Sequence, residues 1–313
     1  MRGIAGQEFR LEELRDKVKH PNDHVVAVAC PDAECIEMLK GLSRQGIGNL
    51  VFEIGSQNGV PAERNPRPMT LEHAESTDPA IAAAIQASIE ASVKAIVDGS
   101  ATALMKGCVN TKQLMGTIFR ENRLRRAGDL WTHFACYEEE GYDQAILSGD
   151  EGVVKYPNPS QRGLIAEGMA RAYRLLFGIE PNIAVLAPNE TDFELMPEFE
   201  GGPRGFKLGG PYSVEVALLP GGAEHKGIKP DDVAGRAHCL LQPDYRAGNT
   251  YHKTHEVSYA MRGVDRGIAG TMAGPRFPFI VTSRGDNERS KRYSTWLSLA
   301  LSELGYYEGA GRV

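Results

Sequence analysis

The stretch that decides the fold is His24-Val25-Val26-Ala27-Val28-Ala29-Cys30, which is followed at once by Pro31-Asp32. A short run of Val and Ala is typical of a buried strand, and Pro with Asp favours a helix start. The pattern predicts a helix over about Ala33–Gln45, ended near Gly46, and then a second strand over Asn49–Ile54. A strand, a helix and a strand in this order indicate a parallel sheet.

The same alternation continues along the chain. Asp78-Pro79 predicts the start of a long helix that ends at Gly99, followed by a strand over Ala101–Met105 and a helix over Lys112–Arg120. The later expected elements are strands over Ala145–Leu147, Asn182–Leu186, Ala237–Leu241 and Phe277–Thr282, a helix capped by Ser160 that stops at Gly178, a helix over Thr250–Met261 capped by Asn249, and a helix over Glu288–Leu304. The glycine-rich segment Gly201–Gly210 is predicted to be a surface excursion.

Composition narrows the class of protein. The chain has 313 residues and a net charge of −6, which argues against a broad nucleic-acid surface. Its five cysteines are odd in number and form no CxxC pair, which fits a reducing cytoplasm. The segment Met1–Lys19 lacks the apolar core of a signal peptide, and no apolar run approaches the roughly 20 residues that span a bilayer. We therefore expect a soluble cytoplasmic protein without a membrane partner.

Two similar stretches suggest where chemistry takes place. Leu104-Met105-Lys106-Gly107 and Val281-Thr282-Ser283-Arg284-Gly285 each read as a strand, a tight turn and a helix start. Free backbone N–H groups and the positive end of a helix dipole favour an anion at such a place. Lys106 adds a cation, and Ser283 with Arg284 adds a hydroxyl and a guanidinium suited to phosphate. Asp286 follows as a candidate base.

Each candidate also has a plain structural interpretation. Lys106 could be a solvated loop lysine, and Thr111, Asp286 and Asn249 could be helix caps. The segment Glu224–Gly227 could be a solvated loop.

Some standard functional motifs are missing or incomplete. The basic run that includes Arg126 reads as a solvated helix end or as a docking patch for a nucleotide pyrophosphate. His252 and His255 stand three residues apart, whereas catalytic zinc motifs use a four-residue spacing, so we expect no metal. The sequence has no Walker A loop and no G-x-G-x-x-G.

Taken in order, several segments resemble the phosphate acetyl/butyryltransferase family, and its butyryl-type branch in particular. The resemblance runs from about residue 24 to 304 and rests on collinear order rather than on one specific motif. The matching segments are Leu104–Gly107 with Thr111, Arg123–Arg126, His133, Gly141–Asp143, Pro181–Leu186 with Glu190, Gly210-Pro211, His225–Ile228, Val233–Ala237, Pro243 through Gly248-Asn249 to Lys253, and Ser283-Arg284.

The resemblance implies a fold of two three-layer α/β domains with mostly parallel sheets and an active-site cleft between the domains. Residues 1–145 with 275–313 would form the first domain, and residues 146–274 the second. It also implies a homodimer or higher homo-oligomer. The implied reaction is reversible exchange, in which acyl-CoA and phosphate give acyl phosphate and CoA. CoA is then a substrate, and its thiolate attacks the acyl phosphate carbonyl directly in a ternary complex.

The resemblance also implies roles for individual residues. Ser283 and Arg284 match the family's phosphate-binding pair, with Lys106 beside them and Asp286 as our substitute base, because the acetyl branch's aspartate falls near Ser290. The residues expected to bind substrate or CoA are Thr111, Asp150, Asn249, Arg126 and Lys226.

The chain departs from the family pattern at several positions. The butyryl-type run Asp-Ala-Ala-Met-Asn reads Asp150-Glu151-Gly152-Val153-Val154, and the usual acid before Leu-Met-Lys-Gly is replaced by Thr102-Ala103. The usual Gly-Pro-Leu-x-x-Asp reads Gly210-Pro211-Tyr212-Ser213-Val214-Glu215. These changes predict a rebuilt acyl pocket.

Two other functions stay open at this point. One is a non-catalytic or repurposed paralogue that kept CoA or phosphate binding. The other is a dehydrogenase of a phosphorylated hydroxy acid on a related scaffold, which would need metal-binding carboxylates or histidines.

Overall fold

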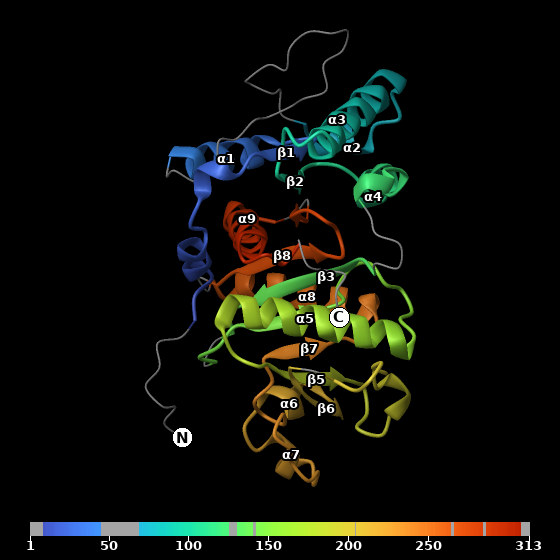
Figure 1. Ribbon diagram of the computed structural model, residues 1–313, viewed down its shortest axis with the longest axis vertical. Coiled ribbons are helices and arrows are strands. Elements are labelled where there is room, and N and C mark those ends of the chain that lie inside the picture. The colour runs from blue at the N-terminus through green and yellow to red at the C-terminus, as the bar shows by residue number, and fades with distance from the viewer. Residues whose placement is uncertain are drawn as a thin grey trace. The chain divides into compact units, whose positions relative to one another are not determined.

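The computed structural model describes residues 9–44, 69–124, 130–139, 142–203, 205–263, 266–283 and 286–307. The chain forms two compact units that we describe separately (Figure 1). The flanking unit comprises Leu14–Asp129 and Ala269–Val313, and the central unit comprises Leu130–Ile268 with Met1–Glu13. The strand expected over Asn49–Ile54 lies outside the described residues.

The flanking unit is built on a parallel sheet with the strand order β1-β2-β9. Its elements are β1 (Val26–Ala29), α1 (Ala33–Arg44), α2 (Leu71–Glu75), α3 (Pro79–Val97), β2 (Ala103–Lys106), α4 (Thr111–Arg120), β9 (Phe279–Ile280) and α9 (Glu288–Glu303), with 3-10 helices at Pro21–Asp23 and Asn122–Leu124. Residue Ala29 is paired with Lys106, so the carboxyl ends of β1 and β2 coincide. The helix α3 packs on β1 and β2, while α9 packs on β9 and against α1.

The helix α3 begins and ends where the sequence predicts. Asp78 caps it by accepting a hydrogen bond from the backbone N–H of Ala80, and Pro79 occupies its first turn. By length and composition alone, α3 is apolar enough to cross a membrane, so the expectation that no such run exists is wrong. Its stripe of Ile85, Ile89 and Val93 is nevertheless buried in the unit, as in the core helix of a globular protein.

The central unit contains a sheet in which the strands run in the order β6-β5-β7-β4-β3. Its elements are β3 (Thr132–Tyr137), β4 (Ile146–Gly149), α5 (Pro159–Phe177), β5 (Asn182–Leu186), β6 (Lys207–Tyr212), α6 (Val214–Leu218), α7 (Gly222–His225), β7 (Cys239–Leu241) and α8 (Tyr245–Arg262), with a 3-10 helix at Phe193–Leu195. The 3-10 helix Leu11–Lys17 and the strand β8 (Ile268–Ala273) cross the boundary between the units. Most pairs are parallel, and β3 runs antiparallel to β4.

Helices cover both faces of the central sheet. Successive strand residues point to opposite faces, and Tyr137 of β3 lies in the same core as Tyr259 of α8. Phe134 of the same strand lies on the other face, where it and Met169 of α5 approach Gly149. This arrangement of helix, sheet and helix is the three-layer α/β architecture that the sequence predicts.

Several boundaries differ from the expected ones. The strand β3 pairs with β4 and therefore lies in the central unit, although the sequence-based division put residues 132–137 in the first domain. The helix α5 is capped by Asn158 rather than Ser160, because Asn158 Oδ1 accepts from the backbone N–H of Gln161 at 2.8 Å. Part of the expected surface excursion is the strand β6, which adds to the edge of the sheet beside β5. All five cysteines are buried and free, so the chain has no disulfide.

Candidate active site

Lys106 is the last residue of β2 and is only 3 % exposed. Its Nζ donates a hydrogen bond to the carbonyl oxygen of Thr282 at 2.9 Å, and Thr282 Oγ1 donates to the carbonyl oxygen of Lys106 at 2.7 Å. These crossed hydrogen bonds join the end of β2 to the segment that follows β9. The interpretation of Lys106 as a solvated loop lysine is therefore wrong. Its ammonium is held at the carboxyl edge of a parallel sheet, where α/β proteins bind ligands.

Gly107 is required by the close approach of two strand ends. Its backbone N–H donates to the carbonyl oxygen of Ala29 at 2.9 Å. A Cβ atom at this position would lie 2.3 Å from the carbonyl oxygen of Cys30, which is backbone and has little freedom to move. The Lys-Gly pair thus combines a buried cation with a residue that lets β1 and β2 converge beside it.

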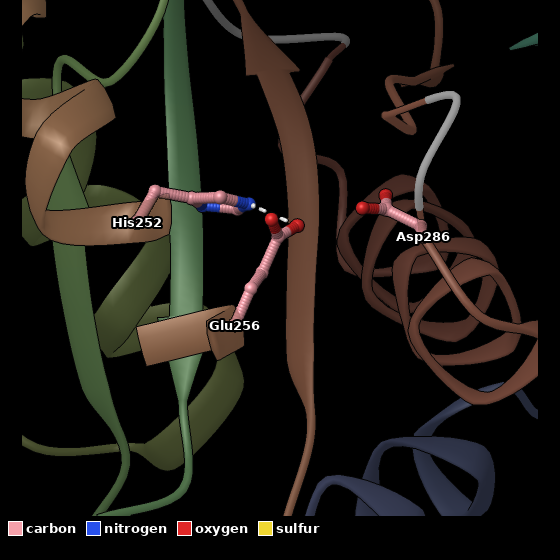
Figure 2. A group of neighbouring side chains, drawn as sticks. All are labelled: His252, Glu256 and Asp286. Carbon is pink, nitrogen blue, oxygen red and sulfur yellow. Dashed lines mark hydrogen bonds and ion pairs between the residues drawn. The ribbon is translucent and has the colours of Figure 1, made fainter. Parts of the chain in front are cut away.

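Two described residues between β9 and α9, Ser283 and Asp286, are joined by two hydrogen bonds. The backbone N–H of Ser283 donates to Asp286 Oδ2 at 2.6 Å, and the backbone N–H of Asp286 donates to the carbonyl oxygen of Ser283 at 3.2 Å. Arg284 lies outside the described residues. Asn287 caps α9 through a 2.9 Å hydrogen bond from the backbone N–H of Ser290, so the interpretation of Asp286 as the cap is wrong. Figure 2 shows the Asp286 carboxylate on the segment that leads into α9. Its role as a base stays a prediction.

A second buried lysine, which the sequence analysis missed, ties the start of α9 to α1. Lys291 is 3 % exposed, and its Nζ lies 2.6 Å from Glu34 Oε2 and 3.4 Å from Asp32 Oδ2. Glu34 Oε1 also accepts from the backbone N–H of Glu288 at 3.1 Å. Burial opposes the charge of Lys291, but the acidic neighbours outweigh it and raise the pKa of that ammonium. This ion pair fixes the helix that follows Ser283 and Asp286.

Thr111 is the first residue of α4 rather than its cap. Asn110 is the cap, and its Oδ1 accepts from the backbone N–H of Lys112 at 2.8 Å. Thr111 is an exposed residue. Its expected part in binding substrate stays a prediction, and Arg126 lies outside the described residues.

In the central unit, Asp150 directly follows β4 and is 1 % exposed. Its carboxylate accepts hydrogen bonds from Thr132 Oγ1 at 2.9 Å, from the backbone N–H of His133 at 2.6 Å and from the backbone N–H of Val153 at 2.9 Å. Burial raises the pKa of Asp150, and these hydrogen bonds act in the opposite direction. The carboxylate thus holds its own turn and the start of β3, a role that was not predicted from the sequence.

Glu151, the next residue, is also buried, and its partners come from distant segments. Its Oε1 accepts from the hydroxyl of Tyr137 at 2.7 Å, and its Oε2 lies 3.0 Å from Nδ1 of His252 on α8. Figure 2 shows the hydrogen bond from His252 to Glu256, one turn further along α8. From the sequence, His252 was considered only as a candidate metal ligand, Glu151 only as a departure from the family pattern, and Tyr137 and Glu256 were not singled out. No local pattern could have found the contacts that join His252 to Glu151 and Tyr137, which lie more than one hundred residues away in the sequence.

Asn249 lies inside α8 and does not cap it. The cap is Asp244, which accepts from the backbone N–H groups of Arg246 and Ala247. Gly248 meets the Asp150 turn so closely that a Cβ atom would lie 2.2 Å from the carbonyl oxygen of Asp150. Asn249 Nδ2 donates to the carbonyl oxygen of Glu151 at 3.4 Å. The Gly-Asn pair therefore docks the first turns of α8 onto the end of β4. An open hollow of about 440 Å³ on α8 is lined by Asn249, Thr250, Lys253, Thr254 and Val257.

Lys226 lies just after α7 and forms an ion pair with Glu190 at 2.9 Å. Its Nζ also donates to Ser213 Oγ at 3.0 Å. The Lys226 ammonium lowers the pKa of Glu190 to about 2. The solvated loop interpretation misses this pairing, which joins the segments that follow β5 and β6. Whether Lys226 binds substrate stays a prediction.

Comparison with solved structures identifies the fold. The chain resembles a branched-chain phosphotransacylase from Enterococcus faecalis, with a TM-score of 0.66 and 20 % identity over 88 % of this chain and 98 % of that structure. A phosphotransacetylase from Streptococcus pyogenes gives the same TM-score with 15 % identity, over 93 % and 97 % of the two chains. The fold is that of the phosphotransacylases.

Comparison of sequences shows which enzymes the chain is similar to. No family model matches the chain. It is 27 % identical to the phosphate butyryltransferase of Clostridium beijerinckii over 308 residues, 93 % of this chain and 97 % of the relative. It is also 27 % identical to the phosphate acetyltransferase of Thermotoga maritima over 216 residues, 65 % of this chain and 71 % of the relative. The chain is therefore similar to phosphate butyryltransferases over nearly its whole length, as the sequence analysis predicts.

Proposed function

We propose that this chain is a phosphate acyltransferase that exchanges CoA and phosphate on a short-chain or modified acyl group. The observation that carries this proposal is the nearly full-length similarity to phosphate butyryltransferases. We place this function ahead of a dehydrogenase because these relatives, like the acetyltransferases, are phosphate acyltransferases.

In the proposed reaction the CoA thiolate attacks the carbonyl carbon of the acyl phosphate. A thioester bond forms, the bond between that carbon and the phosphate oxygen breaks, and phosphate leaves with the electron pair. The reverse direction uses phosphate as the nucleophile. No covalent bond to the protein is needed, so positioning and charge stabilisation supply the rate.

The roles of the residues follow from this chemistry. Ser283 and Arg284 hold the phosphoryl group, and the Lys106 ammonium stabilises negative charge at the carboxyl edge of β2. Asp286 accepts a hydrogen bond from the backbone N–H of Ser283 and is our candidate base for the CoA thiol. Thr111, Asp150, Asn249, Arg126 and Lys226 remain the proposed contacts to substrate or CoA. We further propose that the protein acts in the cytoplasm as a homodimer or higher homo-oligomer, without a catalytic metal.

The test is phosphate-dependent release of free CoA from a panel of acyl-CoAs, followed with a thiol reagent. The panel includes acetyl-, butyryl-, branched-chain and hydroxylated acyl-CoAs, because the altered residues 150–154 and 210–215 predict a changed acyl group. We expect release with at least one of them, no release without phosphate, and no loss of activity in chelator. CoA or phosphate binding without turnover of any member of the panel would favour the non-catalytic paralogue instead.

A further inference from the structure

Glu151 has a fully buried charged side chain at the end of β4. Its side chain is 0 % exposed, and both carboxylate oxygens have partners from other elements, Tyr137 on β3 and His252 on α8. In the pattern of the butyryl-type branch an alanine stands at this place. The carboxylate that stands here is satisfied by partners on two other elements.

Ionisable groups on β3, in the turn after β4 and on α8 itself lie near the His252 ring. Glu151 faces its Nδ1, and the Tyr137 hydroxyl lies 3.2 Å from the same nitrogen. Glu256 Oε1 lies 3.2 Å from its Nε2, and Lys253 pairs with the other oxygen of Glu256 at 2.6 Å. The centroid of the His133 ring on β3 lies 6.2 Å from that of His252. Burial is the main cause, and the neighbouring His252 the next, that lowers the pKa of His133 to about 3, so His133 is neutral. A protonated His252 thus stands between two carboxylates.

Contacts with β3 and α8 hold the strand-end turn, which we define as residues 150–154. Asp150 accepts hydrogen bonds from within this turn and from β3. Asn249 donates to the carbonyl oxygen of Glu151, and Gly248 lies against that of Asp150. The ion pair between Glu151 and His252 joins a side chain of the turn to a side chain of α8.

A buried charge is costly unless a partner and hydrogen bonds satisfy it. An apolar residue of similar size is often no less stable than a buried ion pair, so stability alone is a poor reason for Glu151. A fully bonded carboxylate does hold a backbone segment in one conformation. That distinction points to positioning rather than to packing.

We propose that Glu151 and His252 are positioning residues whose ion pair holds the strand-end turn, with Asp150 in it, in the conformation that turns over acyl-CoA. This inference rests on the proposed acyltransferase function. It assigns the rebuilt part of the family pattern to the shape of the substrate site rather than to loss of activity.

The pair gives the turn a characteristic pH dependence. Burial lowers the pKa of His252, but its hydrogen bonds to Glu151 and Glu256 outweigh burial and raise it to about 9. Because the folded-state pKa is raised above the unfolded value, the stabilisation is complete below the unfolded pKa and is lost as pH rises through about 9. Removing the Glu151 charge should move this loss to lower pH.

The experiment compares the wild type with Glu151→Gln, His252→Gln, their double variant and the control Glu256→Gln. Glu256 contacts the same histidine but is partly exposed. We measure kcat and KM for phosphate-dependent CoA release from pH 6 to 10 on the full chain. We also measure amide hydrogen exchange in the strand-end turn and the Tm of each variant. If Glu151→Gln does not fold, His252→Gln supplies the same comparison.

We expect kcat/KM to fall about tenfold in Glu151→Gln and in His252→Gln and no further in their double variant, because the two residues act as one unit. The alkaline limb of the pH profile should move below pH 9 in Glu151→Gln, and exchange at residues 152–154 should be at least tenfold faster. Glu256→Gln should stay within threefold of the wild type. A lower Tm with unchanged kcat/KM, pH profile and exchange would show a merely structural pair and overturn the proposal.

An inactive wild type would refute the proposed function, and the exchange data would still decide the positioning claim. Faster exchange in Glu151→Gln would then support it, and unchanged exchange would overturn it.

Discussion

The carboxyl strand ends of the two units use charge in opposite ways. In the flanking unit the end of β2 presents a buried ammonium, and Lys106 donates to the backbone carbonyl oxygen of Thr282. In the central unit the end of β4 presents two buried carboxylates, Asp150 and Glu151, that accept hydrogen bonds from their surroundings. A cation at a strand end suits an anionic substrate, whereas acids bonded to their own backbone and to a histidine suit a rigid support. Similar α/β layouts can thus divide binding and positioning between two units.

The largest expected effect tests the flanking strand ends as the phosphate site. If Arg284 holds the phosphoryl group, its planar fork makes two charge-assisted hydrogen bonds that a lysine cannot reproduce. Arg284→Lys should then lose about 2–4 kcal/mol of transition-state stabilisation, or about 30- to 1000-fold in kcat/KM, with an unchanged Tm. Steady-state kinetics and thermal melts measure both. A variant that melts lower but keeps its turnover per folded molecule would make the arginine structural.

Lys106→Met sharpens the same side of the comparison. Methionine fills a similar space without a charge, so the strand end keeps its packing but loses the ammonium. We expect kcat/KM to fall about 10- to 100-fold, equivalent to about 1.4–2.8 kcal/mol. The loss should appear in kcat more than in KM for acyl-CoA if the ammonium acts on the transition state. Wild-type kinetics in this variant would show that the buried lysine only joins Thr282 to β2.

Asp150→Asn tests the opposite claim about the central strand ends. The amide offers one acceptor oxygen where the carboxylate offers two, so some of the N–H donors of the strand-end turn lose their partner. Leaving such buried groups unsatisfied should cost about 1–3 kcal/mol in the free energy of unfolding. Denaturant unfolding followed by fluorescence measures the loss. A large fall in kcat at unchanged stability would show that Asp150 acts through its proposed substrate contact and not as a support of the turn, and would break the comparison.

Local signals in the sequence were enough for much of the fold. Asp78-Pro79 and Gly178 are cap residues whose backbone preferences fix helix ends, and the structure has α3 and α5 begin or end there. The strand β5 has the predicted bounds, Asn182–Leu186. The prediction of helix caps was wrong where the sequence offered two candidate cap residues. The Gly248-Asn249 pair suggested the start of a helix at Asn249. Gly248 is instead a glycine inside α8, at the point where the helix meets the carbonyl oxygen of Asp150.

The candidate site was less predictable because its contacts are not local. Lys106 was recognised by its place after an apolar run, but its bond to Thr282 crosses 176 positions. Glu151 was noticed only as a departure from a pattern, since its partners at 137 and 252 are joined to it by the fold alone. Strand β3 was missed because its antiparallel pairing with β4 follows from that same fold. The roles of the site residues remain predictions.

The smallest expected effect separates a cap from a substrate contact at the start of α4. Asn110 accepts a hydrogen bond from the backbone N–H of Lys112, so Asn110→Ala should lower the free energy of unfolding by about 1 kcal/mol. Thr111 is exposed and is the first helical residue, so Thr111→Ala should change stability by less than about 0.5 kcal/mol. If Thr111 contacts CoA, its variant should raise KM for acyl-CoA a few-fold while kcat stays the same, because a uniform binding contact is removed. Asn110→Ala, measured at a temperature where it is fully folded, is the matched control and should leave that KM unchanged. Equal KM values for the two variants and the wild type would show that Thr111 does not contact CoA. Lys106 at the end of β2 would then be the remaining candidate contact of that strand end.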